Sequence, residues 1–80
     1  MEFSMQVTSK RDNLRPSTTT VEEIICKALS CKVQVKEEKY TPNSFVVTVE
    51  GCMWDRDTAK QKILDKFESD GKYNCWFIQE

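Results

Sequence analysis

The spacing of apolar residues along this 80-residue chain switches several times between a strand-like and a helix-like period, and this switching constrains the fold most. Near the start, Phe3, Met5 and Val7 alternate with polar residues, a pattern that predicts a half-buried strand. Residues 45–49 alternate in the same way. The aromatic run at residues 73–78 predicts a closing strand, central in its sheet and covered on both faces.

Two helices are predicted between these strands. The stretch STTTVEEIICKAL carries apolar residues three and four apart, and Thr20 with Glu23 fits a capping box, as does Thr19 with Glu22. A second helix is expected within DRDTAKQKILDKFESDG, with Asp55 or Asp57 as its N-cap and Gly71 as its stop. The two apolar stripes are Val21, Ile24, Ile25, Ala28 and Leu29, and then Ala59, Ile63, Leu64 and Phe67.

Two segments have less regular patterns. Residues 9–18 predict a basic loop, with a short second strand around Leu14. In KVQVKEEKYTPNS, Val33 and Val35 alternate like a strand, whereas residues 41–44 predict a turn. So short a chain forms one domain, residues 1–80, of the α+β class.

The composition disfavours several classes of function. Twelve Lys and Arg face thirteen Asp and Glu, giving a net charge of −1, so a broad nucleic-acid surface is not expected. The absence of histidine removes the most common general base. Gly51 and Gly71 are the only glycines, too few for a phosphate-binding loop. We therefore expect a non-enzymatic protein that uses no cofactor.

The cysteines predict neither a metal site nor a disulfide framework. They are Cys26, Cys31, Cys52 and Cys75, and none of them forms the Cys-x2-Cys pair of a structural zinc site. The sequence shows no signal peptide and no apolar run long enough to span a membrane. We expect free thiols in a cytoplasmic protein.

Candidate partner-binding residues are basic. Lys10, Arg11 and Arg15 cluster before the first helix, and Lys27 and Lys32 extend this charge along the helix and beyond it. Their simplest interpretation is a solvated turn. The functional interpretation is an electrostatic docking edge for an acidic protein partner. Trp54 and Trp76 are expected in the core, and exposure of either would mark a partner surface.

The order of these elements resembles that of the Ras-association and Ras-binding domains. The resemblance rests on STTTVEEIICKAL, on SFVVTVEG and on the closing SDGKYNCWFIQE, and it touches residues 3–79. It implies a ubiquitin-like β-grasp roll with two helices on a mixed sheet. It also implies a partner, a GTP-bound Ras-family GTPase, that meets a basic strand edge and the first helix at Lys10, Arg11, Arg15, Lys27 and Lys32.

Two alternatives remain open from the residues themselves. If residues 32–36 form a strand paired with residues 45–49, the pattern fits a ferredoxin-like β-α-β-β-α-β sandwich, an interaction or dimerisation module. A double-stranded-RNA-binding type of domain would take AKQKILDKF as its final helix, and the acidic pI of about 5.5 weighs against it. The sequence does not predict an oligomeric state.

Overall fold

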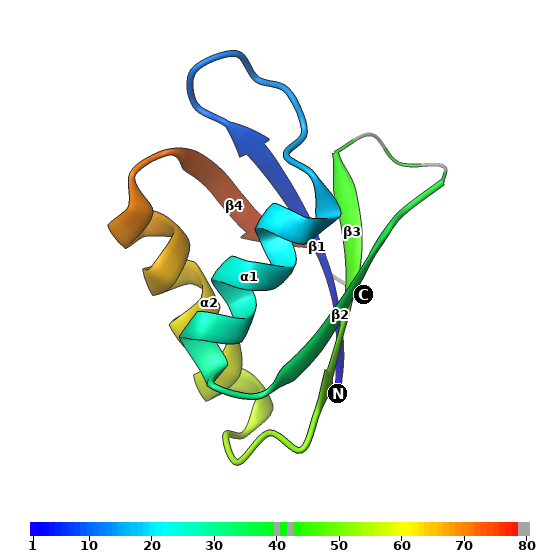
Figure 1. Cartoon of the computed structure of the whole chain (residues 1–80), viewed down its shortest axis with the longest axis vertical. Helices are drawn as coiled ribbons and strands as arrows, with labels where there is room; N and C mark the ends of the chain where they lie inside the picture. Colours follow the sequence, from blue (N-terminus) through cyan, green and yellow to red (C-terminus); the bar gives the residue numbers. More distant parts are fainter. Residues whose placement is uncertain (40, 42, 79–80) are drawn as a thin grey trace.

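Six elements follow one another in the order β-α-β-β-α-β (Figure 1). The computed structural model describes residues 1–39, 41 and 43–78. The elements are β1 (Glu2–Ser9), α1 (Thr18–Leu29), β2 (Lys32–Glu37), β3 (Ser44–Glu50), α2 (Arg56–Asp70) and β4 (Tyr73–Phe77). The predicted α+β class is confirmed, and residues 32–37 form a strand. The turn predicted at residues 41–44 includes Pro42, which lies outside the described residues.

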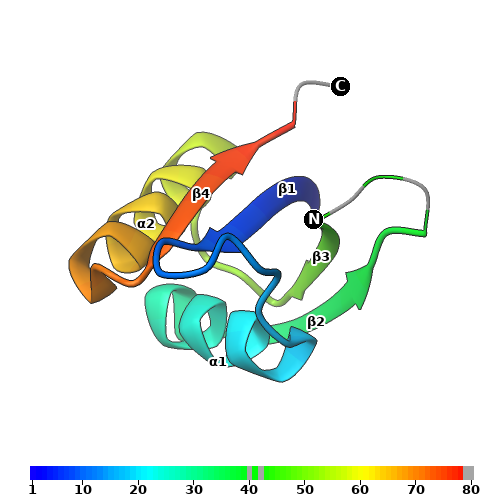
Figure 2. The same cartoon turned by 90° about the horizontal axis from the view of Figure 1, so that it is seen from above.

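The four strands form one sheet in the order β2-β3-β1-β4. Every pairing is antiparallel, so the expectation of a mixed sheet is wrong. β1 lies in the middle, between β3 and β4, and β2 pairs only with β3. Both helices lie on the same side of the sheet, α1 near β2 and α2 near β4 (Figure 2).

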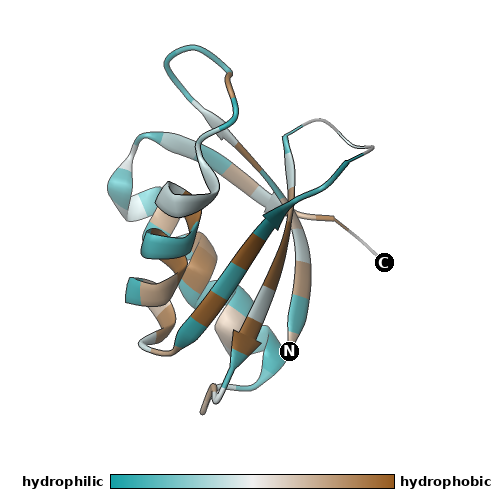
Figure 3. Ribbon diagram, turned by 45° about the vertical axis from the view of Figure 1, so that its right-hand side comes forward, coloured by the Kyte–Doolittle hydropathy of each residue, from teal (hydrophilic) through white to brown (hydrophobic). Residues whose placement is uncertain are grey.

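The core lies between the sheet and the helices. Side chains alternate between the two faces of each strand, visible as alternating hydropathy along β2 and β3 (Figure 3). The helix-facing strand residues that are buried are Phe3, Met5, Val7, Val33, Val35, Phe45, Val47 and Val49. The helices bury Val21, Ile25 and Leu29 from α1 and Ala59, Ile63 and Phe67 from α2 against them. The buried helix faces thus contain most of the two predicted stripes, while Ile24, Ala28 and Leu64 are only half-buried.

The helix ends differ from the predictions at one point. The N-cap of α1 is Ser17, whose hydroxyl accepts a hydrogen bond of 3.2 Å from the backbone N–H of Thr20. Both capping-box registers, which began at Thr19 and Thr20, are therefore wrong. Of the two predicted caps of α2, Asp55 is the one that forms, since its carboxylate accepts from the N–H of Thr58 at 2.7 Å. Gly71 ends α2 with a positive φ of 70°, a conformation that glycine adopts without strain.

The loop between β1 and α1 forms no strand. Two of its backbone bonds are local, from the N–H of Ser9 to the carbonyl of Leu14 and from the N–H of Asn13 to the carbonyl of Ser9, both 2.9 Å. The short strand expected around Leu14 is absent, and Leu14 is exposed. The central position expected for residues 73–78 is also wrong. β4 lies at an edge of the sheet, and the side of it that faces away from the helices is open.

Candidate protein-binding edge

Within residues 1–39, 41 and 43–78, β4 pairs with another strand on one side only. The N–H of Ile78 donates to the carbonyl of Ser4 and the N–H of Lys10 to that of Lys72, both at 2.9 Å, so bonds toward β1 fall at the even-numbered residues. In an antiparallel ladder the intervening residues direct their backbone groups the other way. The N–H and C=O groups of Tyr73, Cys75 and Phe77 therefore point away from β1. Such an edge can accept a further strand.

A groove runs beside this edge. It lies between α2 and β4 and has a volume of about 390 Å³. Its α2 wall carries Gln61, Leu64, Asp65 and Glu68, which share one helix face because they are three and four residues apart. Its β4 wall includes Tyr73, Asn74 and Cys75. We call this space the β4 groove.

Three cations gather where the β4 groove begins. Lys10 and Arg11 of the β1–α1 loop and Lys72 before β4 line a hollow of about 370 Å³, which shares Lys10 and Tyr73 with the β4 groove. Lys10, Arg11 and Lys72 are exposed, and none forms an ion pair with a described residue. We call these three residues the basic cluster. Its charge is available to a partner at one end of the free edge.

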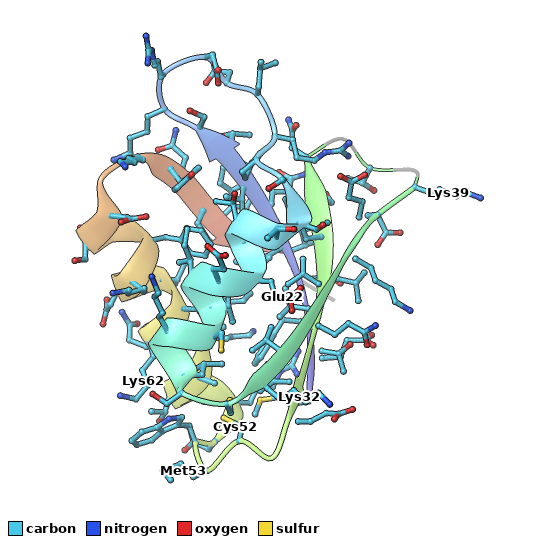
Figure 4. The ribbon with its side chains drawn as sticks, in the orientation of Figure 1. Glu22, Lys32, Lys39, Cys52, Met53 and Lys62 are labelled. Atoms are coloured by element: carbon cyan, nitrogen blue, oxygen red, sulfur yellow. The ribbon has the colours of Figure 1, made fainter. Side chains whose placement is uncertain are left out.

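The five predicted site residues do not form one patch. Lys10 and Arg11 belong to the basic cluster, whereas Arg15 forms an ion pair with Glu37 at 3.2 Å. Lys27 lies in the last turn of α1, and Lys32 begins β2. The 12 residues of α1 span about 18 Å, so Lys27 lies nearly a helix length from the β1–α1 loop. Figure 4 shows Lys32 near Cys52 and Met53, at the end of the molecule opposite that loop.

Sequence reasoning missed Lys72 and the α2 wall of the β4 groove. Lys72 is distant in sequence from Lys10, and its neighbours include Asp70, so local charge gives no signal for it. The turn predicted at Gly71 places Lys72 at the start of the last strand. To place Lys72 beside Lys10, one must also know that this last strand pairs with β1.

The second edge of the sheet, β2, carries one ion pair and also the exposed Lys36. By the same alternation, its outward backbone groups belong to Val33, Val35 and Glu37, because the N–H of Glu38 donates to the carbonyl of Ser44. Glu37 pairs with Arg15, and Lys32 stands opposite Glu50 in the strand register. The β2 edge thus carries charges of both signs, whereas the basic cluster beside β4 has three cations that form no ion pair with a described residue.

The two tryptophans have different surroundings. Trp76 on β4 is 47% exposed and lies opposite Gln6 on the sheet face away from the helices. Core packing was expected for it, and this expectation is wrong. Trp54 is half-buried, with the ammonium of Lys62 4.0 Å from its ring centroid. Exposure of a tryptophan was expected to mark a partner surface, and the ring of Trp76 is exposed.

Two of the four thiols, Cys31 and Cys75, have raised pKa values. Burial raises the pKa of Cys75 to about 12, which keeps this thiol protonated at neutral pH. Burial, and then its hydrogen bond with Cys52, raise the pKa of Cys31. All four cysteines are free, and within the described residues no group of three potential ligands could hold a metal ion.

No protein-family model, curated protein or solved structure matches the chain. In the described part of the chain, neither helix has the length and apolar character that crossing a bilayer requires.

Proposed function

We propose that this protein is a non-catalytic interaction module that pairs β4 with an extended segment of an acidic protein partner. The observation that carries the proposal is the coincidence of a free strand edge with an unpaired basic cluster at its end. Main-chain hydrogen bonds supply affinity in strand addition, and side-chain contacts and charge supply register and selectivity.

We also propose that the scaffold is ferredoxin-like. The order β-α-β-β-α-β supports this, together with β1 between β3 and β4 and the β2–β3 pairing. A β-grasp roll would need residues 12–17 as a strand paired with β1, and β1 instead pairs with β3 and β4. The ferredoxin-like arrangement matters for function because it leaves β4 as a free edge.

A GTP-bound Ras-family GTPase is the specific partner that we propose to test. The order of elements along the sequence suggested this partner, and the position of Lys10 and Arg11 beside a free strand edge supports it. The four free thiols support the cytoplasm as the location of this interaction.

The experiment is a titration of the ¹⁵N-labelled protein with Ras-family GTPases that carry a non-hydrolysable GTP analogue or GDP. We expect shifts at Tyr73, Cys75 and Phe77 with the GTP analogue only, and weaker binding in higher salt. Arg11→Glu and Lys72→Glu should each weaken this binding. Lys27→Glu is the matched control, because Lys27 lies at the far end of α1.

The outcomes separate the possible binding modes. Equal loss with Lys27→Glu would favour docking through the first helix and contradict docking at β4. Absence of nucleotide-dependent binding across the family would remove the GTPase as partner. Concentration-dependent dimerisation in light scattering, with shifts centred on Trp76, would favour a dimerisation module.

A further inference from the structure

We infer that the strand added to β4 runs antiparallel to it, with apolar side chains toward α2 and acidic residues at its C-terminal end. This inference rests on the proposed function and specifies the segment that the edge accepts. It follows from the direction of β4, from the position of the basic cluster and from the two surfaces that flank the edge.

The backbone fixes where the segment lies. Hydrogen-bonded strands run about 4.8 Å apart, so a segment bonded to Tyr73, Cys75 and Phe77 extends the sheet alongside α2. The side chains of these three β4 residues face the helices, because they pair with Ser9, Val7 and Met5 in register. Segment residues opposite them point to the same side and enter the β4 groove.

The groove is lined by polar and apolar residues, and it offers apolar contacts to uncharged side chains at these positions. Leu64 lies on its α2 wall and Cys75 on its β4 wall, and the Tyr73 ring packs edge-on against Phe67 with 6.0 Å between centroids. Asp65 and Glu68 on the same wall repel an acidic side chain. The intervening segment residues point to the open face, beside the exposed ring of Trp76.

The basic cluster sets the preferred polarity, since the cation at the other end of β4, Lys60, lies over the Phe77 ring. Lys72 immediately precedes Tyr73, and the N–H of Lys10 is bonded to its carbonyl, so the cations lie at the N-terminal end of β4. An antiparallel segment brings its C-terminal end there, and antiparallel pairing is also the slightly more stable arrangement. Acidic residues at that end meet Lys10, Arg11 and Lys72, whereas the apolar positions of the segment face the groove wall that carries Asp65 and Glu68.

The experiment compares two synthetic peptides of identical composition. Both alternate valine with threonine, and three glutamates follow the alternating part in one peptide and precede it in the other. Both have blocked termini, so that terminal charges do not contribute. Each is titrated into the ¹⁵N-labelled protein at low salt, with the Trp76 indole N–H and the amides of β4 as reporters.

We expect the peptide with C-terminal glutamates to bind at β4 about tenfold more tightly than the other peptide. Each of the three exposed charge pairs contributes modestly to the binding free energy. Lys72→Glu should abolish the preference, and Lys27→Glu should preserve it. Equal or tighter binding of the other peptide at β4 overturns the polarity and leaves strand addition in place. Shifts confined to Val33, Val35 and Glu37 of β2, or no binding of either peptide, overturn both the inference and docking at β4.

Discussion

The backbone N–H of Lys10 donates a hydrogen bond of 2.9 Å to the carbonyl oxygen of Lys72, which joins the loop after β1 to the turn before β4. The bond continues the β1–β4 ladder by one pair beyond the strands themselves. Two cationic side chains are thereby placed on neighbouring backbones, and Arg11 follows directly. The basic cluster is thus a product of sheet pairing and does not depend on side-chain bonds.

Replacement of Ser17 by alanine should destabilise the protein by about 1 kcal/mol. The substitution removes the hydroxyl that accepts from the N–H of Thr20 and leaves that N–H without its cap. Urea denaturation measures the change. Thr19→Ala is the control, because Thr19 is exposed and is not the cap. A larger loss at Thr19 than at Ser17 would restore the capping box that starts there.

Replacement of Ile63 by alanine should destabilise the protein by about 2–5 kcal/mol, because Ile63 is fully buried and the change leaves a cavity. So small a core has little stability to lose, and much of the protein should then be unfolded. Circular dichroism and thermal denaturation report this. Leu64→Ala, on the half-buried side of the same turn, should cost clearly less. Similar losses for the two variants would contradict the packing of α2.

Replacement of Lys62 by methionine should destabilise the protein by about 0.5–1 kcal/mol, the contribution of a cation over an aromatic face. The Lys62 ammonium lies 4.0 Å from the centroid of the half-buried Trp54 ring. Chemical denaturation measures the loss, and tryptophan fluorescence should shift with it. Lys66→Met on the same helix is the matched control. An equal loss of stability there would show that the effect comes from removing a positive charge from α2 and not from the contact with Trp54.

Stability should fall as the pH rises from about 9 toward 12. The pKa of Cys75 is about 12 in the fold and 9.0 as an ordinary thiol, because burial opposes the thiolate. Above pH 9 the unfolded chain therefore loses this proton before the folded chain does, and unfolding is favoured. The contribution of the Cys75 thiol to the free energy of unfolding is complete below its ordinary pKa. It is lost as the pH approaches the pKa of the thiol in the folded protein.

Comparison with Cys75→Ala isolates this contribution. Lysines, tyrosines and the other thiols titrate in both proteins, so only the difference between the two stability curves reports Cys75. That difference should narrow, or change sign, between pH 9 and 12. Parallel curves over this range would show that Cys75 ionises as readily in the folded chain as in the unfolded one.

Local features of the fold could be predicted from the sequence. The alternation of Phe3, Met5 and Val7 identified a strand and its buried face, and Asp55 and Gly71 were recognised as helix ends. Each of these depends on residues within a few positions of one another, where side-chain spacing and capping chemistry act directly.

Strand neighbours could not be predicted in the same way. A period of two shows that β4 has an apolar face, but not whether another strand lies on each side of it. Its aromatic content indicated a central strand, whereas α2 covers one face and Trp76 is exposed on the other. Ser17 was passed over as N-cap because Thr19 and Thr20 offered equal chemistry within the same turn.

The position of β1 also has a consequence for the assembly of the chain. β1 is synthesised first of the six elements, but one of its two partners, β4, is synthesised last. Pairing between elements that are far apart in sequence slows folding, because the entropy cost of closing a long loop precedes the stabilising contacts. Until β4 emerges, the β1 backbone on that side has no partner. A chain cut short before Tyr73 would expose a different edge, without the β4 groove and with a greater tendency to aggregate.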